Sequence, residues 1–167
     1  MTAADAAGGD AGLAIRPAAA AHAGLIAEFN RALAAESEGL TLDTEVVAEG
    51  VQAVLADPAR GRYFLAEVDG RVVGQMLITT EWSDWRNGWF WWVQSVYVLP
   101  DCRRRGVFGR LYTHILETAR RRQDVCGLRL YVDRNNTPAR EVYTRLGMTH
   151  TRYRLYEADW SSARGPE

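Results

Sequence analysis

Three stretches of β-forming residues follow one another in the middle of the chain with only short connections between them. Residues 63–68 and 72–80 flank Asp69 and Gly70, and an Asp-Gly pair tolerates the positive φ values that a tight hairpin turn requires. Residues 89–98 form a third stretch, rich in aromatic and β-branched side chains. Strands joined by such short turns pair antiparallel, so this region fits a mixed sheet better than a doubly wound sheet, in which a helix separates successive strands.

Helical patterns lie on both sides of these strands. In the first of them, apolar residues recur at helical spacing at Leu25, Ile26, Phe29 and Leu33. Thr44 can cap a second helix that runs to residue 55. The other expected elements are a strand at 13–16, a helix after Gly109, a strand at 127–132, a helix at 137–146 and a strand at 148–157. We therefore expect an α/β protein with a mixed, mostly antiparallel central sheet flanked by helices.

The length of the chain suits a single domain. Its 167 residues can bury a substantial core, and we expect the domain to span 13–160 between flexible tails at 1–12 and 161–167. No apolar run reaches the roughly 18 residues of a membrane-spanning helix. The N-terminus also lacks the basic and apolar regions of a secretory signal. These features predict a cytoplasmic protein that does not bind a membrane.

Two cysteines are present, Cys102 and Cys126, too few for a disulfide framework and without the spacing of a zinc site. We therefore expect no metal. Arginines near Cys102 could stabilise a thiolate, but no histidine lies close in sequence to support a nucleophile.

The charge is divided unevenly along the chain, although the formal net charge is only −1. All 20 basic residues are arginine, and residues 1–84 carry 5 of them against 13 acidic residues, whereas residues 85–167 carry 15 against 8. A basic half of this kind is one feature of nucleic-acid-binding modules. The acidic first half and the overall neutrality argue against that class, and we expect no nucleic-acid partner.

A glycine-bearing loop with three arginines precedes the third helical pattern. It contains Arg103, Arg104 and Arg105, followed by Gly106 and Gly109. A helix N-terminus has unpaired N–H groups and a partial positive charge, so a glycine there lets a pyrophosphate approach the backbone. The alternative is a glycine-rich helix start whose arginines are simply solvated. The phosphate loop GxxxxGK(S/T) is impossible in a chain without lysine.

A second motif lies in the segment from Asn136 to Gly147. Ala139 and Tyr143 are four residues apart and therefore share one helix face. Asn136 stands at the start of this helix, where its side chain can either cap the helix or reach a ligand, and Gly147 ends it. Tyr143 can likewise be a half-buried core aromatic or a functional residue.

Together, in this order, the two segments resemble the GCN5-related N-acetyltransferase (GNAT) family. That family has Q/R-x-x-G-x-G/A after a central strand and N-x-x-A-x-x-x-Y-x-x-x-G further along the chain. Arg103 takes the Q/R position and Gly106 the first glycine, but Phe108 stands where the family has Gly or Ala, and Gly109 comes one residue later. The departure changes the side chain at this position of the loop, whereas the backbone N–H, which the resemblance implies as the ligand group, is kept in Phe108.

The resemblance implies that acetyl-CoA binds in a V-shaped opening between the central strand and the strand near residue 128. It implies that backbone groups of Val96 and Val98 bind the pantetheine arm and that the amides from Arg104 to Gly109 hold the pyrophosphate. The full set implied to bind acetyl-CoA is Val96, Tyr97, Val98, Arg103, Arg104, Arg105, Gly106, Val107, Phe108, Gly109, Asn136, Ala139 and Tyr143. Tyr143 would also be the general acid that protonates the leaving thiolate, and homodimers are common in the family.

The acceptor implied by the resemblance is a primary amine, either a small molecule or a protein group. Residues 36–43 and 82–88 are the expected substrate loops, and Glu81, Trp82, Asp84 and Gln94 are the candidate acceptor residues in an aromatic and acidic mouth. No residue is assigned as the general base. The missing base and Phe108 keep a second interpretation open, a regulatory domain that binds acyl-CoA without turnover.

Overall fold

The computed structural model describes residues 12–160 and forms two compact units, which divide after Tyr131. The elements of the first unit are β1 (Leu13–Pro17), η1 (Ala20–His22), α1 (Ala23–Glu38), α2 (Thr44–Ala56), β2 (Arg62–Val68), β3 (Arg71–Ser83), β4 (Gly88–Val98), η2 (Pro100–Cys102), α3 (Val107–Arg120) and β5 (Val125–Leu130). The second unit contains α4 (Thr137–Arg145). The tails expected at 1–12 and 161–167 lie outside the described residues, apart from Gly12.

The sheet has the order β1-β2-β3-β4-β5. The first four strands pair antiparallel in sequence order, and β5 alone pairs parallel, along β4. The Asp-Gly turn is formed as expected, with Asp69 at φ 49° and Gly70 at φ 79°. The predictions of an α/β fold and of a mixed, mostly antiparallel sheet are therefore confirmed.

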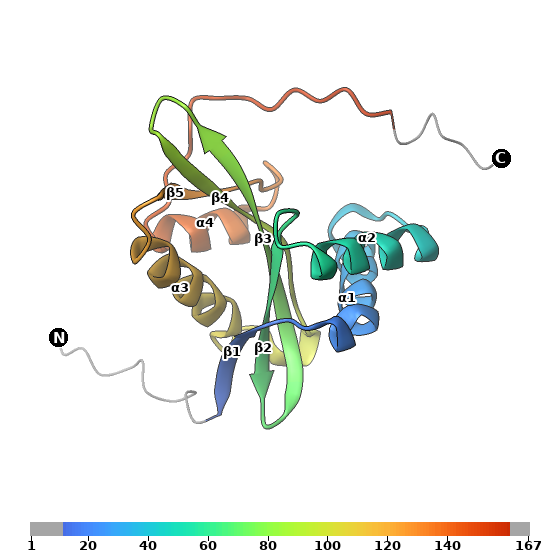
Figure 1. The fold of residues 1–167 in the computed structure, drawn as a ribbon. Helices are drawn as coiled ribbons and strands as arrows, with labels where there is room; N and C mark the ends of the chain where they lie inside the picture. The colour runs from blue at the N-terminus through green and yellow to red at the C-terminus, as the bar shows by residue number, and fades with distance from the viewer. Residues whose placement is uncertain (1–11, 161–167) are drawn as a thin grey trace. The chain divides into compact units, whose positions relative to one another are not determined.

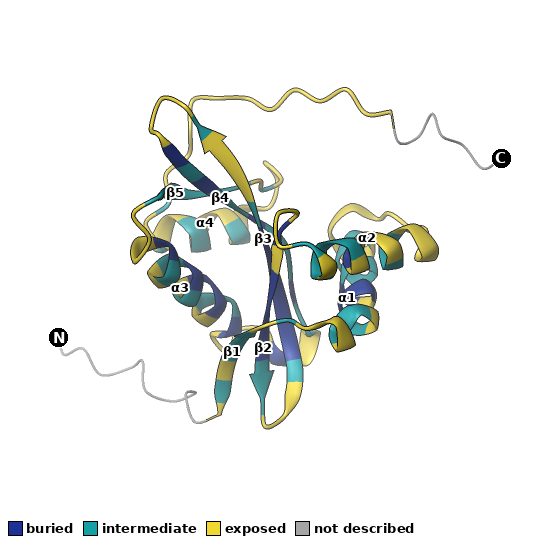
Figure 2. Cartoon of the chain, in the orientation of Figure 1, coloured by how far each residue is buried: buried dark blue, intermediate teal, exposed yellow. Residues whose placement is uncertain are grey.

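Helices of the first unit cover both faces of this sheet (Figure 1). Side chains alternate along a strand, so two consecutive residues of β2 point to opposite faces of the sheet. Tyr63 packs in a buried cluster with Ile26 of α1 and Val51 of α2. Phe64 instead places its ring 5.7 Å from that of His114 in α3. The dark blue segments of Figure 2 follow the middle strands between these two helical layers.

One expected strand is absent from the structure. Residues 148–157 form no strand, and most of their side chains are exposed. A run of β-forming residues shows only that a segment suits a pleated, half-buried surface. A strand forms only where a neighbouring strand completes its hydrogen bonds. The prediction of a final strand was therefore wrong for this segment. Among the helices of residues 12–160, none combines the length and apolar character needed to cross a bilayer.

Candidate functional site

The central strand β4 is bulged near its C-terminal end. Tyr97 pairs with Gln75 and Gln94 with Leu77, so the single residue Met76 of β3 faces two residues of β4. The two are Ser95 and Val96, and Ser95 has a left-handed backbone with φ 47°. For a residue with a side chain this conformation costs about 1 kcal/mol or more, and such strain is concentrated at functional sites. The bulge changes the direction of the backbone groups at this point of the strand.

β4 and β5 separate next to this bulge. Their parallel pairing runs from Trp89 with Val125 to Val93 with Leu130, where β5 ends. β4 continues to Val98, and on its other side that last part remains paired with β3. The backbone groups at the β4 edge around Val96 are therefore not paired with β5. An extended ligand with amide groups needs such unpaired groups to form hydrogen bonds with the strand.

The loop that precedes α3 has the backbone conformation expected of an anion site. Gly106 is the N-cap of α3 with φ 79°, and Arg104 also has a positive φ of 61°. Bonding within the helix begins when Arg110 N–H donates to Gly106 O at 3.0 Å, so the preceding N–H groups are not used inside the helix. The Phe108 ring lies along the helix beside Tyr112, with centroids 6.1 Å apart. These features fit a pyrophosphate at the helix N-terminus.

Arg103 is held by protein groups. Its guanidinium donates to Glu36 Oε2 at 2.5 Å and to Val98 O at 2.9 Å, and Tyr97 donates its hydroxyl to Glu36 Oε1 at 2.9 Å. The hydrogen bond from Arg103 is the main cause that lowers the pKa of Glu36. Burial, followed by the bond to Glu36, raises the pKa of Tyr97. Arg103 thus ties the end of α1 to the end of β4.

Neutralising Glu36 should remove this tie. The folded pKa of Glu36 is lowered, so the tie stabilises the fold above the ordinary value of 4.5 and is lost as pH falls through the lowered value. We expect Glu36→Gln to reduce the free energy of unfolding at pH 7 by about 1 kcal/mol or less, because the pair is partly exposed. Urea unfolding over a falling pH series should show the two proteins converging. The control Glu38→Gln removes a carboxylate from the same helix end but keeps the Arg103–Glu36 pair, so it should leave the free energy of unfolding at pH 7 nearly unchanged.

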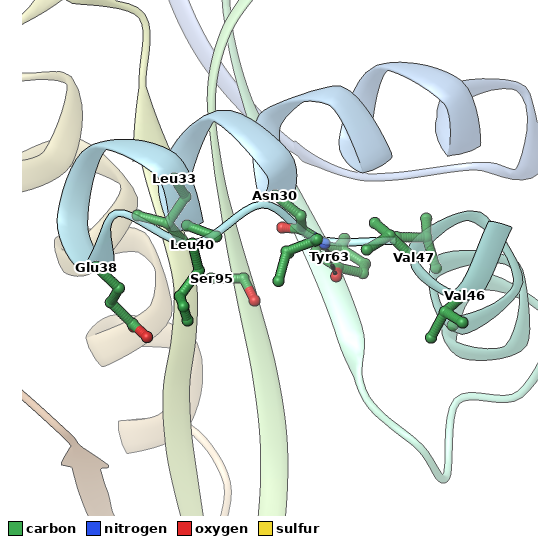
Figure 3. Close-up of a pocket in the computed structure, with 12 residues that line it drawn as sticks. Asn30, Leu33, Glu38, Leu40, Val46, Val47, Tyr63 and Ser95 are labelled. Carbon is green, nitrogen blue, oxygen red and sulfur yellow. Dashed lines mark hydrogen bonds between the residues drawn. The ribbon is translucent and has the colours of Figure 1, made fainter. Parts of the chain in front are cut away.

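A pocket of about 440 Å³ lies on the α1 and α2 face of the sheet and reaches the bulge. In Figure 3, Leu33 and Glu38 lie on one side, Val46 and Val47 lie on the other, and Tyr63 lies between them. The pocket is lined by Asn30, Leu33, Ala34, Glu38, Leu40, Leu42, Val46, Val47, Gly50, Val51, Tyr63 and Ser95. Its volume falls in the range of roughly 300–1,000 Å³ that small-molecule sites occupy.

Three lining residues, Asn30, Tyr63 and Ser95, are uncharged and polar, and they form a hydrogen-bonded cluster with the buried Gln75, which does not itself line the pocket; we call these three lining residues the polar floor. Asn30 donates to the Tyr63 hydroxyl at 3.0 Å, and Gln75 donates to Asn30 Oδ1 at 2.7 Å and to Ser95 O at 3.3 Å. Burial is the main cause that raises the pKa of Tyr63, and hydrogen bonds with Asn30 and Ser95 act against it. Tyr63 therefore remains an uncharged phenol at neutral pH.

The expected acceptor residues lie apart from this pocket. Glu81 pairs with Phe90 across the sheet, and Ser95 lies five residue steps further along the strand, a distance of about 16 Å. The Glu81 carboxylate is bound by Arg129 at 2.8 Å and by the Trp92 indole at 2.6 Å. None of residues 82–88 lines the pocket, whereas Glu38, Leu40 and Leu42 of the other expected loop do.

The remaining three candidates are also engaged by their neighbours. Trp82 packs edge-on against Trp89 at 4.9 Å, Asp84 accepts from Trp85 N–H at 2.9 Å, and Gln94 donates to Thr79 Oγ1 at 2.7 Å. A role in acceptor binding for Glu81, Trp82, Asp84 and Gln94 stays a prediction, and the structure does not gather these four residues around the pocket.

The second unit carries the other motif. Asn136 Oδ1 accepts from Ala139 N–H at 3.1 Å, so its side chain caps α4. Tyr143 is half-buried, and burial raises its pKa above the ordinary value of 10.0. A phenol with a raised pKa is protonated at neutral pH, as a general acid must be.

The three uncharged polar residues of the pocket were not predicted as site residues from the sequence. Asn30 interrupts the apolar stripe of α1, and a polar residue on a core-facing stripe was a usable signal. Tyr63 lies in a β-forming stretch, where an aromatic residue is ordinary and indicates no function. Ser95 gave no signal, because a left-handed strand residue is expected to be glycine.

Comparison with known proteins identifies the family. The model of the acetyltransferase (GNAT) family matches residues 28–148, from α1 in the first unit to just after α4 in the second. A search of proteins with curated functions finds no significant match. The family match covers well over half of the chain, which therefore belongs to the GNAT acetyltransferase family.

Solved structures have the same fold. A structure described as a possible acetyltransferase from Clostridium difficile 630 is 41% identical, covers 89% of this chain and 97% of its own, and superposes with a TM-score of 0.84. One described as a predicted acetyltransferase with acetyl-CoA, from Clostridium acetobutylicum, is 15% identical with coverages of 90% and 97% and a TM-score of 0.72. An aminoglycoside acetyltransferase from an uncultured soil metagenomic sample, in complex with sisomicin, is 15% identical with coverages of 89% and 97% and a TM-score of 0.70.

Proposed function

We propose that residues 13–160 form an acetyl-CoA-dependent N-acetyltransferase that acts on a primary amine. The observation that carries the proposal is the position of the bulge in β4. Ser95 lines the pocket, and the adjacent Val96 lies just past the point where the β4–β5 pairing ends. An acceptor in the pocket and a thioester along the free strand edge would therefore meet at one point of β4.

The groups proposed to bind acetyl-CoA fit its chemistry. Backbone groups of Val96 to Val98 would bind the amide-bearing arm, in the manner of a strand partner. The N-terminus of α3 behind Gly106 would bind the pyrophosphate. Arg104 and Arg105 are exposed beside this helix end and would attract the phosphates over a longer range. Acetyl-CoA supplies the activated acetyl group, and this chain supplies position and one proton.

The reaction then needs a single displacement. The neutral amine nitrogen bonds to the acetyl carbon, and the carbon–sulfur bond breaks with its electron pair on sulfur. Tyr143 donates its hydroxyl proton to the departing thiolate, whose conjugate acid has an ordinary pKa of about 8.5. The proton lost by the new amide nitrogen passes to water, and the Tyr143 phenolate regains a proton from solvent.

Two measurements on the same protein test this function. Acetyl-CoA is expected to raise the Tm, and a panel of primary amines is expected to release free CoA thiol only in the presence of the protein. A rise in Tm without thiol release from any amine of a broad panel would favour the regulatory domain that binds acyl-CoA. The absence of both the rise in Tm and the thiol release would contradict the proposal altogether.

A further inference from the structure

The pocket on the α1 and α2 face has apolar walls around an uncharged floor. The walls are formed mainly by leucine and valine side chains, among them Leu33, Leu42, Val47 and Val51. We propose, resting on the proposed function, that the acceptor is a primary monoamine with an apolar body and that it enters this pocket as the free base. The walls would bind the body, and the amine would meet the polar floor beside the bulge.

The charges around the pocket favour an acceptor with a single amino group, because one exposed carboxylate stabilises a second ammonium ion by little. Among the lining residues, Glu38 is the only one with a carboxylate, and none is basic. The Glu38 side chain is exposed, so it can attract an ammonium ion from solvent, but it does not hold that ion at the polar floor of the pocket. Glu36, near the same helix end, is already paired with Arg103. A polycation would therefore leave further charges against apolar walls, which is unfavourable without partners.

The floor is suited to a neutral amine. The Tyr63 hydroxyl accepts a hydrogen bond from Asn30 and is also hydrogen-bonded to Ser95. Together the two hydroxyl oxygens have four lone pairs and these bonds use at most two, so the pair can still accept from an amine N–H. Gln75 Oε1 is buried and has no partner within residues 12–160. Gln75 does not itself line the pocket, so this oxygen can accept one further donor through a water molecule. With uncharged acceptors on the floor, an ammonium ion would be desolvated there without compensation, whereas a free amine would be hydrogen-bonded with its lone pair available.

This arrangement also removes the need for a base in the protein. The acceptor loses its proton in solvent, before it reaches the polar floor. The fraction of the amine that is unprotonated in solvent therefore limits the rate. The apparent pKa in kcat/KM should then follow the amine that is used, and the rate should rise with pH up to that value.

The test compares acceptors that differ in one feature. Hexylamine should be acetylated with a kcat/KM about 10-fold or more above that of 1,6-diaminohexane, which places a second ammonium among the apolar walls. Val46→Asp adds a carboxylate to the α2 wall at a side chain that is 67% exposed, and it should shift the preference toward the diamine. Gln52→Asp adds the same charge to an exposed position of α2 that does not line the pocket, and it should leave the preference unchanged.

The outcomes separate this inference from the proposed function. Faster turnover of 1,6-diaminohexane or an aminoglycoside than of hexylamine would overturn the monoamine class and leave the acetyltransferase standing. A pH profile with the same pKa for hexylamine and for the less basic benzylamine would overturn binding as the free base. Turnover of neither monoamines nor polyamines would overturn both proposals. The comparison of acceptors uses the parent protein, so it does not depend on the folding of a variant.

Discussion

Replacing Tyr143 by phenylalanine is expected to lower kcat by about 10²-fold, because the leaving thiolate loses its proton donor. The change removes one hydroxyl and keeps the ring, so packing around α4 should be preserved. The Kd for acetyl-CoA should change little, since the phenol acts on the thiolate that forms as the bond breaks. Steady-state thiol release and calorimetric titration with acetyl-CoA measure the two quantities.

A second tyrosine provides the control for this change. Tyr153 is 66% exposed in the same unit, and Tyr153→Phe removes the same atom. It is expected to retain the parent kcat. Equal kcat in the parent and in Tyr143→Phe would remove Tyr143 from the proposed mechanism and leave the proton donor to another group or to water.

Replacing Gly106 by alanine is expected to raise the Kd for acetyl-CoA about 10-fold, since a residue with a Cβ resists φ 79° by about 1–2 kcal/mol. A Cβ at this position meets no atom within 4 Å, so backbone conformation rather than a clash causes the effect. The loop would relax away from the geometry that presents the N–H groups of α3. Calorimetric titration measures the change.

The neighbouring glycine makes the comparison specific. Gly109 lies inside α3 with an ordinary helical φ, and a Cβ there also meets nothing within 4 Å. Gly109→Ala should bind acetyl-CoA as the parent does and should stabilise the helix slightly. Equal weakening by both substitutions would mean that the positive φ of Gly106 is not what shapes the phosphate site.

The fold was predictable where local chemistry determines it. The Asp-Gly turn and the short connection before β4 required antiparallel pairing, and the apolar spacing of α1 required a helix on one face of the sheet. The final strand was wrongly predicted because residues 148–157 have β-forming side chains, and a sequence pattern does not reveal whether a partner strand is present.

The candidate site was predictable only in part, and for a related reason. Gly106 revealed the loop before α3, since a helix start with positive φ favours glycine. The bulge at Ser95 depends on the register between β3 and β4, which no single residue records. The pairing of Arg103 with Glu36 was not predictable, because the two residues lie 67 apart in sequence, and the binding of acetyl-CoA by Arg103 stays a prediction. The acidic and aromatic composition near 81–84 predicts an acceptor site, but composition does not reveal that Arg129 binds the Glu81 carboxylate.

The most direct test of the account is a two-substrate kinetic experiment with acetyl-CoA and hexylamine, in which free CoA and N-acetylhexylamine are both quantified. The account predicts one acetamide formed for each thiol released, intersecting lines when one substrate is varied at fixed levels of the other, and no acetylated protein by mass spectrometry. Parallel lines together with an acetylated protein would contradict direct transfer at the β4 bulge. Thiol release without any acetamide would contradict amine acetylation itself.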